Sequence, residues 1–336
     1  MHAVVTMIDV ANAAGVSAMT VSNVVNGRPH VREETRRRVL DAIDALGYRM
    51  NVAAQALRAG RTGLIGLAVP QIDRPYFGQL AAMLTERFAA EGMRLVVEQT
   101  GASREGELDA FYFSKLRMYD GLVLSAVGLG QSDVDLLGLG FPIVVIGERI
   151  SDRHVDHVGM ANVEGARAAT EHLLARGCRR IVVLGGNVDD TDVSMPTLRT
   201  EGYRQALEEA GVPWCEDLMA ACDFTMEGGA QAIHLLVESG LEFDGVFGLT
   251  DSAAIGALRG LADVGLRCPQ DVKVIGFDDV REARFTVPTL SSVNPGHVEM
   301  VDAVARLLMH RIQGVTDEHE NVIGPFSVVP RGSTGD

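Results

Sequence analysis

Cysteine, lysine and long apolar runs are all scarce in this sequence of 336 residues. The four cysteines lie far apart and form no CxxC pair, which argues against a zinc site or a disulfide framework and favours reduced thiols in a cytosol. No apolar stretch reaches the roughly 18 residues of a membrane span, and no charged leader precedes an apolar run. We therefore expect a cytoplasmic protein with no membrane partner.

Motifs of the common catalytic sites are missing as well. GxxxxGK[ST], GxSxG and HExxH do not occur, and the nine histidines are scattered without the spacing of metal ligands. The stretch VGLGQSD begins like a dinucleotide-binding GxGxxG, but Asp133 stands at the third glycine. We therefore expect no enzymatic activity, no cofactor and no bound metal.

The net charge of −15 is spread unevenly along the chain. Residues 1–61 contain eight arginines and five acidic residues, a net charge of +3, which leaves −18 for the remainder. A basic N-terminal segment on an acidic body predicts that only this segment contacts a polyanion. Within it, however, residues 15–27 (GVSAMTVSNVVNG) carry no charged side chain at all.

The N-terminal segment has the pattern of three short helices. Thr6, with Asp9 three residues later, can cap a first helix that ends at Gly15, and Ser17 can cap a second helix after a tight turn. A third helix begins near Arg32 and is expected to bury Val39, Leu40, Ile43 and Leu46. This is the helix-turn-helix arrangement, which places its second helix in the DNA major groove. A plain three-helix bundle with a polar face is the alternative.

The uncharged second helix suits a DNA-reading role, because short amide, hydroxyl and apolar side chains let a helix approach base edges closely. Helical spacing turns Val21, Val24 and Val25 inward. The residues expected to face outward are Ala18, Met19, Ser22, Asn23 and Asn26. The arginines expected to bind phosphate from flanking positions are Arg28, Arg32, Arg36 and Arg58.

The stretch VTMIDVANAAGVSAMTVSNVVNG…TRRRVLDAIDALGYRMNVAAQALRAGRTGLIGLAVP closely resembles the lactose/galactose-repressor (LacI/GalR) family of bacterial transcription regulators. The resemblance extends more loosely to VVPRGST and covers essentially the whole chain. It implies a regulator, in most cases a repressor, that binds a pseudo-palindromic operator as a homodimer under control of a small effector. It assigns base reading to Ala18 and Met19. Residues matched to backbone anchoring, or otherwise expected to contact DNA, are Thr6, Ser17, Thr20, Ser22, Asn23, Asn26, Arg28, Arg32 and Asn51.

Departures from the family pattern limit what can be carried over about the operator. Asn23 stands where arginine is common and Met50 where proline is common, so the resemblance does not indicate which bases occupy the inner positions of each half-site.

Residues 51–60 (NVAAQALRAG) would form a hinge helix that is marginal in water on its own. In the family this hinge folds only on DNA, where the leucine matching Leu57, with Ala54 one turn earlier, enters the minor groove. A linker helix with Leu57 packed on the protein's own body is the alternative.

From Leu64 onward apolar strand-like runs alternate with amphipathic helices, and the rhythm restarts after about residue 160. This pattern predicts parallel sheets covered on both faces. The predicted fold class is an N-terminal all-α helix-turn-helix headpiece followed by an α/β, periplasmic-binding-protein-like core of two doubly wound parallel-sheet subdomains. The resemblance implies chain crossings near 161, 291 and 321. The expected ranges are headpiece 1–48, hinge 49–61 and core 62–336, with an N-subdomain of about 62–161 and 292–320 and a C-subdomain of about 162–291 and 321–332.

Ligands of open α/β sheets bind beyond the carboxyl ends of the strands. The residues that follow strand-like runs, and are expected to meet an effector there, are Tyr76, Phe77, Ser125, Asp251 and Asp278. The resemblance adds Arg199, from RTEGYRQAL, and Phe224 as an aromatic that stacks on effector, and it places Arg74 where asparagine is usual. Because Ala161 replaces the family's aspartate, Glu164 is expected to supply a carboxylate. Structural roles for Asp251 (helix cap), Asp278 and Phe224 (core) stay open.

A guanidinium, carboxylates and aromatic rings together suit a neutral polyol, so the expected effector is a sugar. A nucleobase corepressor stacked on Phe77 and Phe224 is the second hypothesis, and a sugar-binding protein without a regulatory role is the third. After Val329 there are no apolar heptads, so we expect a dimer rather than a tetramer. Neither the effector's identity nor whether it induces or corepresses follows from the sequence.

Overall fold

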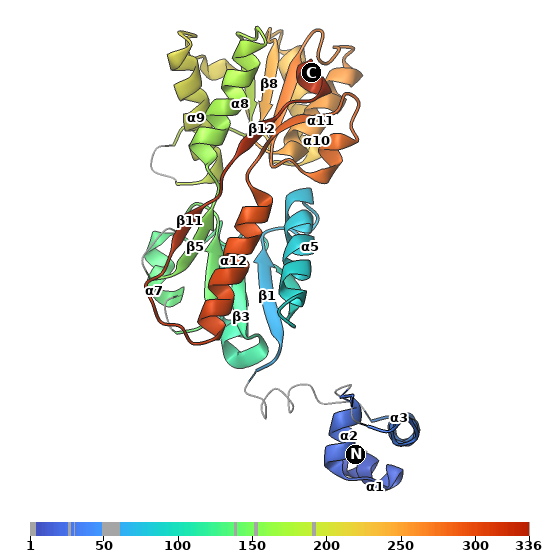
Figure 1. Ribbon diagram of the computed structural model, residues 1–336. Coiled ribbons are helices and arrows are strands. Elements are labelled where there is room, and N and C mark those ends of the chain that lie inside the picture. The colour runs from blue at the N-terminus through green and yellow to red at the C-terminus, as the bar shows by residue number, and fades with distance from the viewer. Residues whose placement is uncertain are drawn as a thin grey trace. The chain divides into compact units, whose positions relative to one another are not determined.

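The computed structural model describes residues 5–25, 28–29, 31–48, 61–137, 140–150, 154–189 and 193–335. The chain divides into two compact units, Met1–Thr62 and Gly63–Asp336. The first contains the predicted headpiece helices and the second the α/β core (Figure 1). No helix in these ranges has the length and hydropathy needed to cross a bilayer. The same residues contain no grouping of His, Cys, Asp and Glu side chains suited to hold a metal ion.

The headpiece consists, in its described part, of α1 (Met7–Ala14), α2 (Ala18–Val25) and α3 (Glu33–Leu46). The predicted capping box is confirmed: the Asp9 N–H donates to Thr6 Oγ1 at 3.3 Å, and the Thr6 N–H donates to Asp9 Oδ2 at 2.8 Å. Gly15 ends α1 with a left-handed φ of 62°. The core residues are Val10, Ala11, Ala14, Val21, Val24, Val39 and Ala42.

Helix α3 buries fewer side chains than predicted. Val39 and Ala42 are buried, but Leu40 and Leu46 are 47% and 36% exposed. The reason is the size of the partner helices: α1 and α2 have eight residues each and cover only one narrow stripe of α3. Leu40 lies next to that stripe in sequence but about 100° around the helix from Val39.

The N-subdomain is built, in the described residues, on a six-stranded parallel sheet of order β11-β5-β4-β3-β1-β2. Its strands are β1 (Leu64–Val69), β2 (Arg94–Gln99), β3 (Gly121–Ser125), β4 (Ile143–Ile146), β5 (Asp156–Gly159) and β11 (Asn321–Ile323). Its helices are α5 (Pro75–Ala89), α6 (Arg104–Phe113), α7 (Val134–Leu137) and α12 (His297–Ile312), with the π-helix η1 (Ser114–Met118) and the 3₁₀ turn η2 (Gln131–Asp133). Alternation along β1 explains the two layers: Ile65 and Leu67 pack with α5 and α12, whereas Ala68 packs with α6 and α7.

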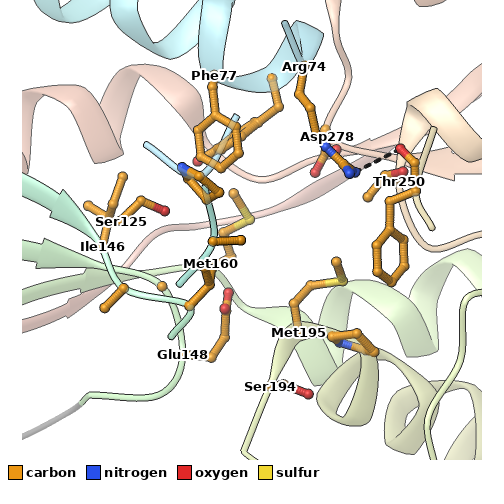
Figure 2. Close-up of a pocket in the computed structure, with 18 of the residues that line it drawn as sticks. Arg74, Phe77, Ser125, Ile146, Glu148, Met160, Ser194, Met195, Thr250 and Asp278 are labelled. Carbon is orange, nitrogen blue, oxygen red and sulfur yellow. Dashed lines mark hydrogen bonds between the residues drawn. The ribbon is translucent and has the colours of Figure 1, made fainter. Parts of the chain in front are cut away.

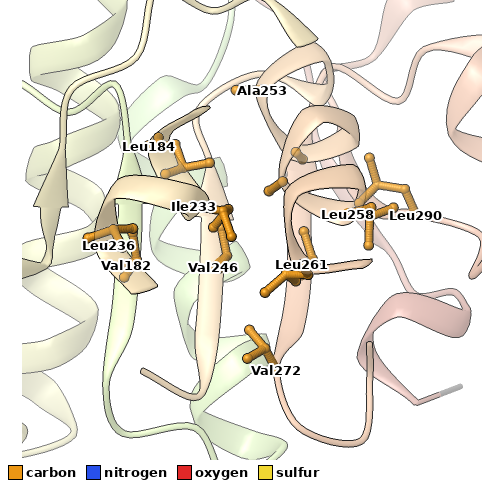
Figure 3. Packing of buried hydrophobic residues seen from close by; sticks show 14 of the residues in the cluster. Val182, Leu184, Ile233, Leu236, Val246, Ala253, Leu258, Leu261, Val272 and Leu290 are labelled. Carbon is orange, nitrogen blue, oxygen red and sulfur yellow. The ribbon is translucent and has the colours of Figure 1, made fainter. Parts of the chain in front are cut away.

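The C-subdomain repeats this design with a described sheet of order β12-β10-β9-β8-β6-β7, in which only β12 pairs antiparallel to its neighbour. Its strands are β6 (Ile181–Leu184), β7 (Met219–Ala220), β8 (Gly245–Gly248), β9 (Lys273–Phe277), β10 (Ser291–Asn294) and β12 (Ser327–Val329). Its helices are α8 (Asn162–Ala175), α9 (Met195–Glu209), α10 (Met226–Glu238) and α11 (Asp251–Asp263), with η3 (Glu216–Leu218), η4 (Arg281–Arg284) and η5 (Gly332–Thr334). Figure 3 shows Ile233 of α10 and Leu258 and Leu261 of α11 packed in the layer that also buries Val246 of β8.

The chain crosses between the two subdomains at three places in the described residues. The crossings lie between β5 and α8, between β10 and α12, and between β11 and β12. The second and third differ from the expected 291 and 321, because β10 (Ser291–Asn294) pairs with β9 and β11 (Asn321–Ile323) pairs with β5. Strands of three or four residues show an alternation that is too short to indicate which sheet they join.

Candidate functional site

The exposed face of α2 is the first candidate site. Ser17 Oγ accepts from the Thr20 N–H at 3.1 Å and lies 2.9 Å from Thr20 Oγ1, so the Ser17 hydroxyl caps the helix. Ala18 and Met19 in the first turn are exposed, and the Met19 side chain is 71% exposed. Val21 and Val24, on the opposite face, are buried. Helix α2 therefore presents a short, uncharged surface to its surroundings.

Cationic side chains follow α2 in the chain. Arg28 and Arg32 are exposed, and Arg36 Nη2 donates to the carbonyl oxygen of Arg28 at 3.1 Å. Ser22 and Asn23 are half-buried on α2. The other residues predicted to contact DNA lie outside the described residues: Asn26, Asn51, Ala54, Leu57 and Arg58.

The second candidate site is a cavity of about 400 Å³ between the two subdomains. Its wall combines residues from both subdomains, near the carboxyl ends of strands such as β3, β4 and β9. Figure 2 shows Phe77, Ser125 and Ile146 on one side of this space and Thr250 and Met195 on the other. The volume lies in the range of small-molecule sites, and the mixture of apolar walls with a few polar groups is typical of them.

Arg199 is the buried centre of the cavity's polar part, with its side chain 2% exposed. Its Nε donates to Asn162 Oδ1 at 2.8 Å, and its Nη1 lies 3.5 Å from Asp278 Oδ1. The guanidinium carbon lies 3.5 Å from the ring centroid of Phe277. Its Nη2 contacts the sulfur of Met160 at 3.3 Å. Because a thioether is a weak acceptor, a ligand oxygen at Nη2 would form the stronger hydrogen bond.

A hydrogen bond ties this centre to the N-subdomain. Asn162 Nδ2 donates at 2.8 Å to Oε1 of Glu148, which follows β4 and lines the cavity. Glu148, Asn162 and Arg199 thus form a chain from one subdomain to the other. The carboxylate oxygens of Glu148 and Asp278 can each accept further hydrogen bonds from ligand hydroxyls.

Carboxylates at the cavity and behind its wall oppose the charge of the Arg199 guanidinium. Burial raises the pKa of Asp278 to about 6, against the opposing attraction of Arg199. Burial raises the pKa of Asp251 well above its usual range, and the nearby Asp278 charge adds to the rise. Burial lowers the pKa of Arg199, and Asp278 and Glu148 oppose that change. This balance of charge suits an uncharged ligand rich in hydroxyl groups.

Asp278 is held in an unusual backbone conformation, with φ of 115°. Such a φ is disfavoured for a residue with a Cβ and persists where the surroundings enforce it. The Asp278 N–H donates to the Val293 carbonyl at 2.9 Å, and its own carbonyl oxygen contacts His297 Nε2. The β10 strand and the start of α12 therefore hold the carboxylate that faces Arg199.

Comparison with known proteins identifies the family. The model of bacterial regulatory proteins of the lacI family matches residues 6–51, and that of the periplasmic binding protein-like domain matches residues 170–334. The transcriptional regulator CelR of Thermobifida fusca is 33% identical over 317 residues, which are 92% of both chains. The chain belongs to the LacI family. Members of the LacI family are DNA-binding transcriptional regulators and not enzymes.

Solved structures of the LacI family share the whole fold. The CelR–cellobiose complex is 31% identical with a TM-score of 0.71, and the match covers 98% of this chain and 99% of that one. The lac repressor dimer bound to operator and the anti-inducer ONPF is 27% identical with a TM-score of 0.77, again over 98% and 99% of the two chains. The predicted fold class is therefore confirmed.

Most of the effector residues predicted for this LacI-family regulator line the cavity. They are Tyr76, Phe77, Ser125, Arg199, Phe224 and Asp278. They come from a strand end, loops and helices distant in sequence, which the two sheets bring to one space. That they bind an effector stays a prediction.

Glu164 does not line the cavity. It is exposed on α8, whereas Asn162, two residues earlier, is buried and bonded to Arg199. Two residues correspond to about 200° around a helix, so a helix that turns Asn162 inward must turn Glu164 outward. Glu148 occupies the place at the cavity that Glu164 was expected to fill.

Asp251 also lies away from the cavity wall, fully buried behind it. Its carboxylate accepts from the Val280 N–H at 2.8 Å and from Ser292 Oγ at 2.6 Å, so it joins α11 to the segments after β9 and in β10. It is not the helix cap either, because Thr250 Oγ1 accepts from the Ala253 N–H at 3.3 Å. Asp251 therefore has a structural role.

Sequence reasoning missed several lining residues. Glu148 is the second residue after β4, so the rule that ligands bind beyond the carboxyl ends of strands, which found Ser125, could have found it too. Ser194 and Met195 begin α9, about ten residues after β6 ends, where that rule does not reach. Met160 and Met300 have no sequence feature that separates them from core methionines.

Proposed function

We propose that this LacI-family protein is a cytoplasmic repressor that binds a pseudo-palindromic operator as a homodimer and is released by a sugar in the cavity between its subdomains. The observation that carries the proposal is the cavity's composition: a buried guanidinium and carboxylates of compensated charge, between aromatic walls. The exposed, uncharged face of α2 in the same chain supplies the DNA-reading part.

Operator reading rests on α2. Ala18 and Met19 would contact base edges, while Arg28 and Arg32, which follow α2 in the chain, would hold phosphates. The test is selection of duplexes from a random library with the purified protein. We expect enrichment of a palindrome, and a selection without any enriched sequence would contradict the proposal.

Hinge residues are proposed to open the operator's centre, with Leu57 as the wedge. Leu57→Ala should then weaken binding to the selected operator far more than binding to random DNA, because DNA deformation contributes only at the right site. Gln55→Ala in the same segment is the control. Equal losses on both DNAs for Leu57→Ala would contradict the wedge.

A sugar fits the cavity's size and chemistry. The volume of about 400 Å³ corresponds to roughly 13 water molecules at about 30 Å³ each, which is room for a mono- or disaccharide. Arg199 and Asp278 would bind adjacent hydroxyls, and the rings of Phe77 and Phe224 would cover apolar faces of the sugar. CelR was solved with cellobiose, which makes cellobiose the first sugar to test.

Effector control follows from the cavity's position between two subdomains. A ligand that binds one relative orientation of the subdomains more tightly shifts the protein toward that orientation, and operator affinity changes with it.

The test follows the fluorescence anisotropy of the labelled operator in the presence of the protein and cellobiose, glucose, ribose, adenine or hypoxanthine. Release by a sugar is expected, and Glu148→Gln should reduce it. Glu164→Gln, an equal change on an exposed residue, is the matched control.

Dimer formation is supported by an exposed apolar patch on the C-subdomain. Next to η4, Phe285 and Val287 are 76% and 96% exposed, and Met226 lies beside Phe285 in a shallow groove. The lac repressor was solved as a dimer. Sedimentation at micromolar concentration should give a dimer that Phe285→Asp converts to monomers. A tetramer, or a variant that stays dimeric, would contradict this.

A nucleobase corepressor is the second candidate. Phe77 and Phe224 both line the cavity, and their rings could stack on a planar base. In the same anisotropy assay adenine or hypoxanthine would then tighten operator binding, whereas sugars would have no effect. That outcome keeps the architecture and reverses the sign of regulation.

A further inference from the structure

Arg74 connects the two subdomains at the edge of the cavity. Its Nη1 donates to the Phe224 carbonyl and its Nη2 to the Asp223 carbonyl, both at 3.0 Å, and its Nε contacts Gln71 Oε1. Arg74 precedes α5 in the N-subdomain, whereas Asp223 and Phe224 precede α10 in the C-subdomain. Figure 2 shows Arg74 on the same side of the central space as Asp278. The guanidinium is thus occupied by backbone carbonyls of the opposite subdomain.

The backbone of Arg74 is restrained by the start of α5. Arg74 is the N-cap residue of α5, and the next residue, Pro75, has a restricted backbone. The Arg74 carbonyl accepts from the N–H groups of Phe77 and Gly78 at 3.0 and 3.2 Å. Because the start of α5 holds the Arg74 backbone in place, the guanidinium can restrain the carbonyl groups of Asp223 and Phe224 that it contacts.

Phe224 has a disfavoured backbone conformation that requires support from its surroundings. Its φ is 63°, in the left-handed region that residues with a Cβ rarely adopt. Its ring covers Gly185 so closely that a Cβ there would lie 2.4 Å from Phe224 Cε1. The ring also lines the cavity. The direction of this aromatic wall therefore depends on a disfavoured peptide conformation, and Arg74 binds the carbonyl of that residue.

Another hydrogen bond between the subdomains provides a contrast. The Arg281 N–H donates to Gln79 Oε1 at 3.0 Å, from η4 to α5. Neither residue is among the described residues that line the cavity. Because this hydrogen bond joins the subdomains away from the cavity, its loss should leave the cavity wall unchanged. Loss of a hydrogen bond that shapes the cavity should change the wall.

We propose that Arg74 is a positioning residue for the effector site: it holds Phe224 from the opposite subdomain and so makes the cavity's aromatic wall depend on closure of the two subdomains. The proposal rests on the proposed effector role of the cavity. Arg74 also lines the cavity, but three of its five N–H groups already face protein oxygen atoms, so the positioning role does not require contact with the ligand.

The first test measures hydrogen–deuterium exchange of the full-length protein without ligand or DNA. The amides to follow are those of Thr225, which donates to Asp223 Oδ1 at 3.1 Å, and Gly228, which donates to Thr225 Oγ1 at 2.9 Å. Losing a charge-assisted hydrogen bond should raise exchange here about tenfold in Arg74→Ala. Arg74→Lys, which keeps a donor, should raise it less, and Gln79→Ala should leave it unchanged. No rise in Arg74→Ala, or an equal rise in Gln79→Ala, would overturn the proposal.

The second test is calorimetric titration with cellobiose of the wild type, Arg74→Ala, Phe224→Leu and the double variant. Both single variants should bind more weakly, and the double variant no more weakly than Phe224→Leu, because the same contact is lost. Additive losses would overturn the positioning role. Absence of cellobiose binding to the wild type would count against cellobiose as effector, and the exchange result would then decide the role of Arg74 by itself.

Discussion

Replacing Arg199 by methionine tests whether one buried cation organises the cavity. Methionine keeps an unbranched apolar stem two atoms shorter than arginine, so the change removes the charge and the donors and leaves only a small void. With Asp278 Oδ1 at 3.5 Å, the attraction at an effective dielectric of about 20 is about 5 kcal/mol. Removal of one partner from a buried pair costs about 3–5 kcal/mol. Because the pKa of Asp278 is already about 6, proton uptake relieves part of that cost, and we expect a loss of about 3 kcal/mol.

Urea unfolding followed by Trp214 fluorescence measures this loss in the relevant subdomain. Trp214 is the sole tryptophan, and its ring centroid lies 5.8 Å from that of Tyr203 on α9. With an m-value of about 3 kcal/mol/M, the midpoint should fall by about 1 M. Arg167→Met removes a surface pair with Glu209 and should lower stability by less than about 1 kcal/mol.

The double variant Arg199→Met, Asp278→Leu separates pairing from packing. With both charges removed, its loss should be smaller than the sum of the two single losses. Additive losses, or an Arg199→Met midpoint within about 0.2 M of wild type, would refute the view that this pair organises the buried cluster.

Three further outcomes follow from the same structure. Burial raises the pKa of Asp278 from 3.8 to about 6, so the folded state binds the proton more tightly than the unfolded state. Stability should therefore fall by about 2 kcal/mol as pH rises from about 4 to 6.5, and Asp278→Asn should flatten that slope in urea titrations. Met19→Ala should change headpiece stability by less than about 0.5 kcal/mol, yet alter the bases enriched in operator selection. Gly202→Ala would place a Cβ 2.1 Å from the Val163 carbonyl and should lower the urea midpoint of the C-subdomain, whereas Gly78→Ala, with open space around it, should raise stability by up to about 1 kcal/mol.

Local features of the sequence determined the elements and the kind of protein. The Thr6 capping box, the Gly15 turn and the apolar spacing of Val21 and Val24 are short-range patterns, and the headpiece helices follow them. The alternation of apolar runs with amphipathic helices determined the two layered sheets. The strand-end rule brought Tyr76 and Ser125 to the cavity, because parallel strands align their carboxyl ends wherever a sheet forms.

Tertiary structure alone decided the contacts inside the site. The pairing of β11 with β5 and the burial of Asp251 depend on which segments meet across long stretches of chain. Arg74 and Phe224 are 150 residues apart, and their hydrogen bond exists only because two separately folded sheets face each other. The rotation of α8 decided that Asn162 faces Arg199 while Glu164 faces outward. Periodicity reports which side of an element is apolar, whereas the partner of a polar side chain is set by the packing of distant elements.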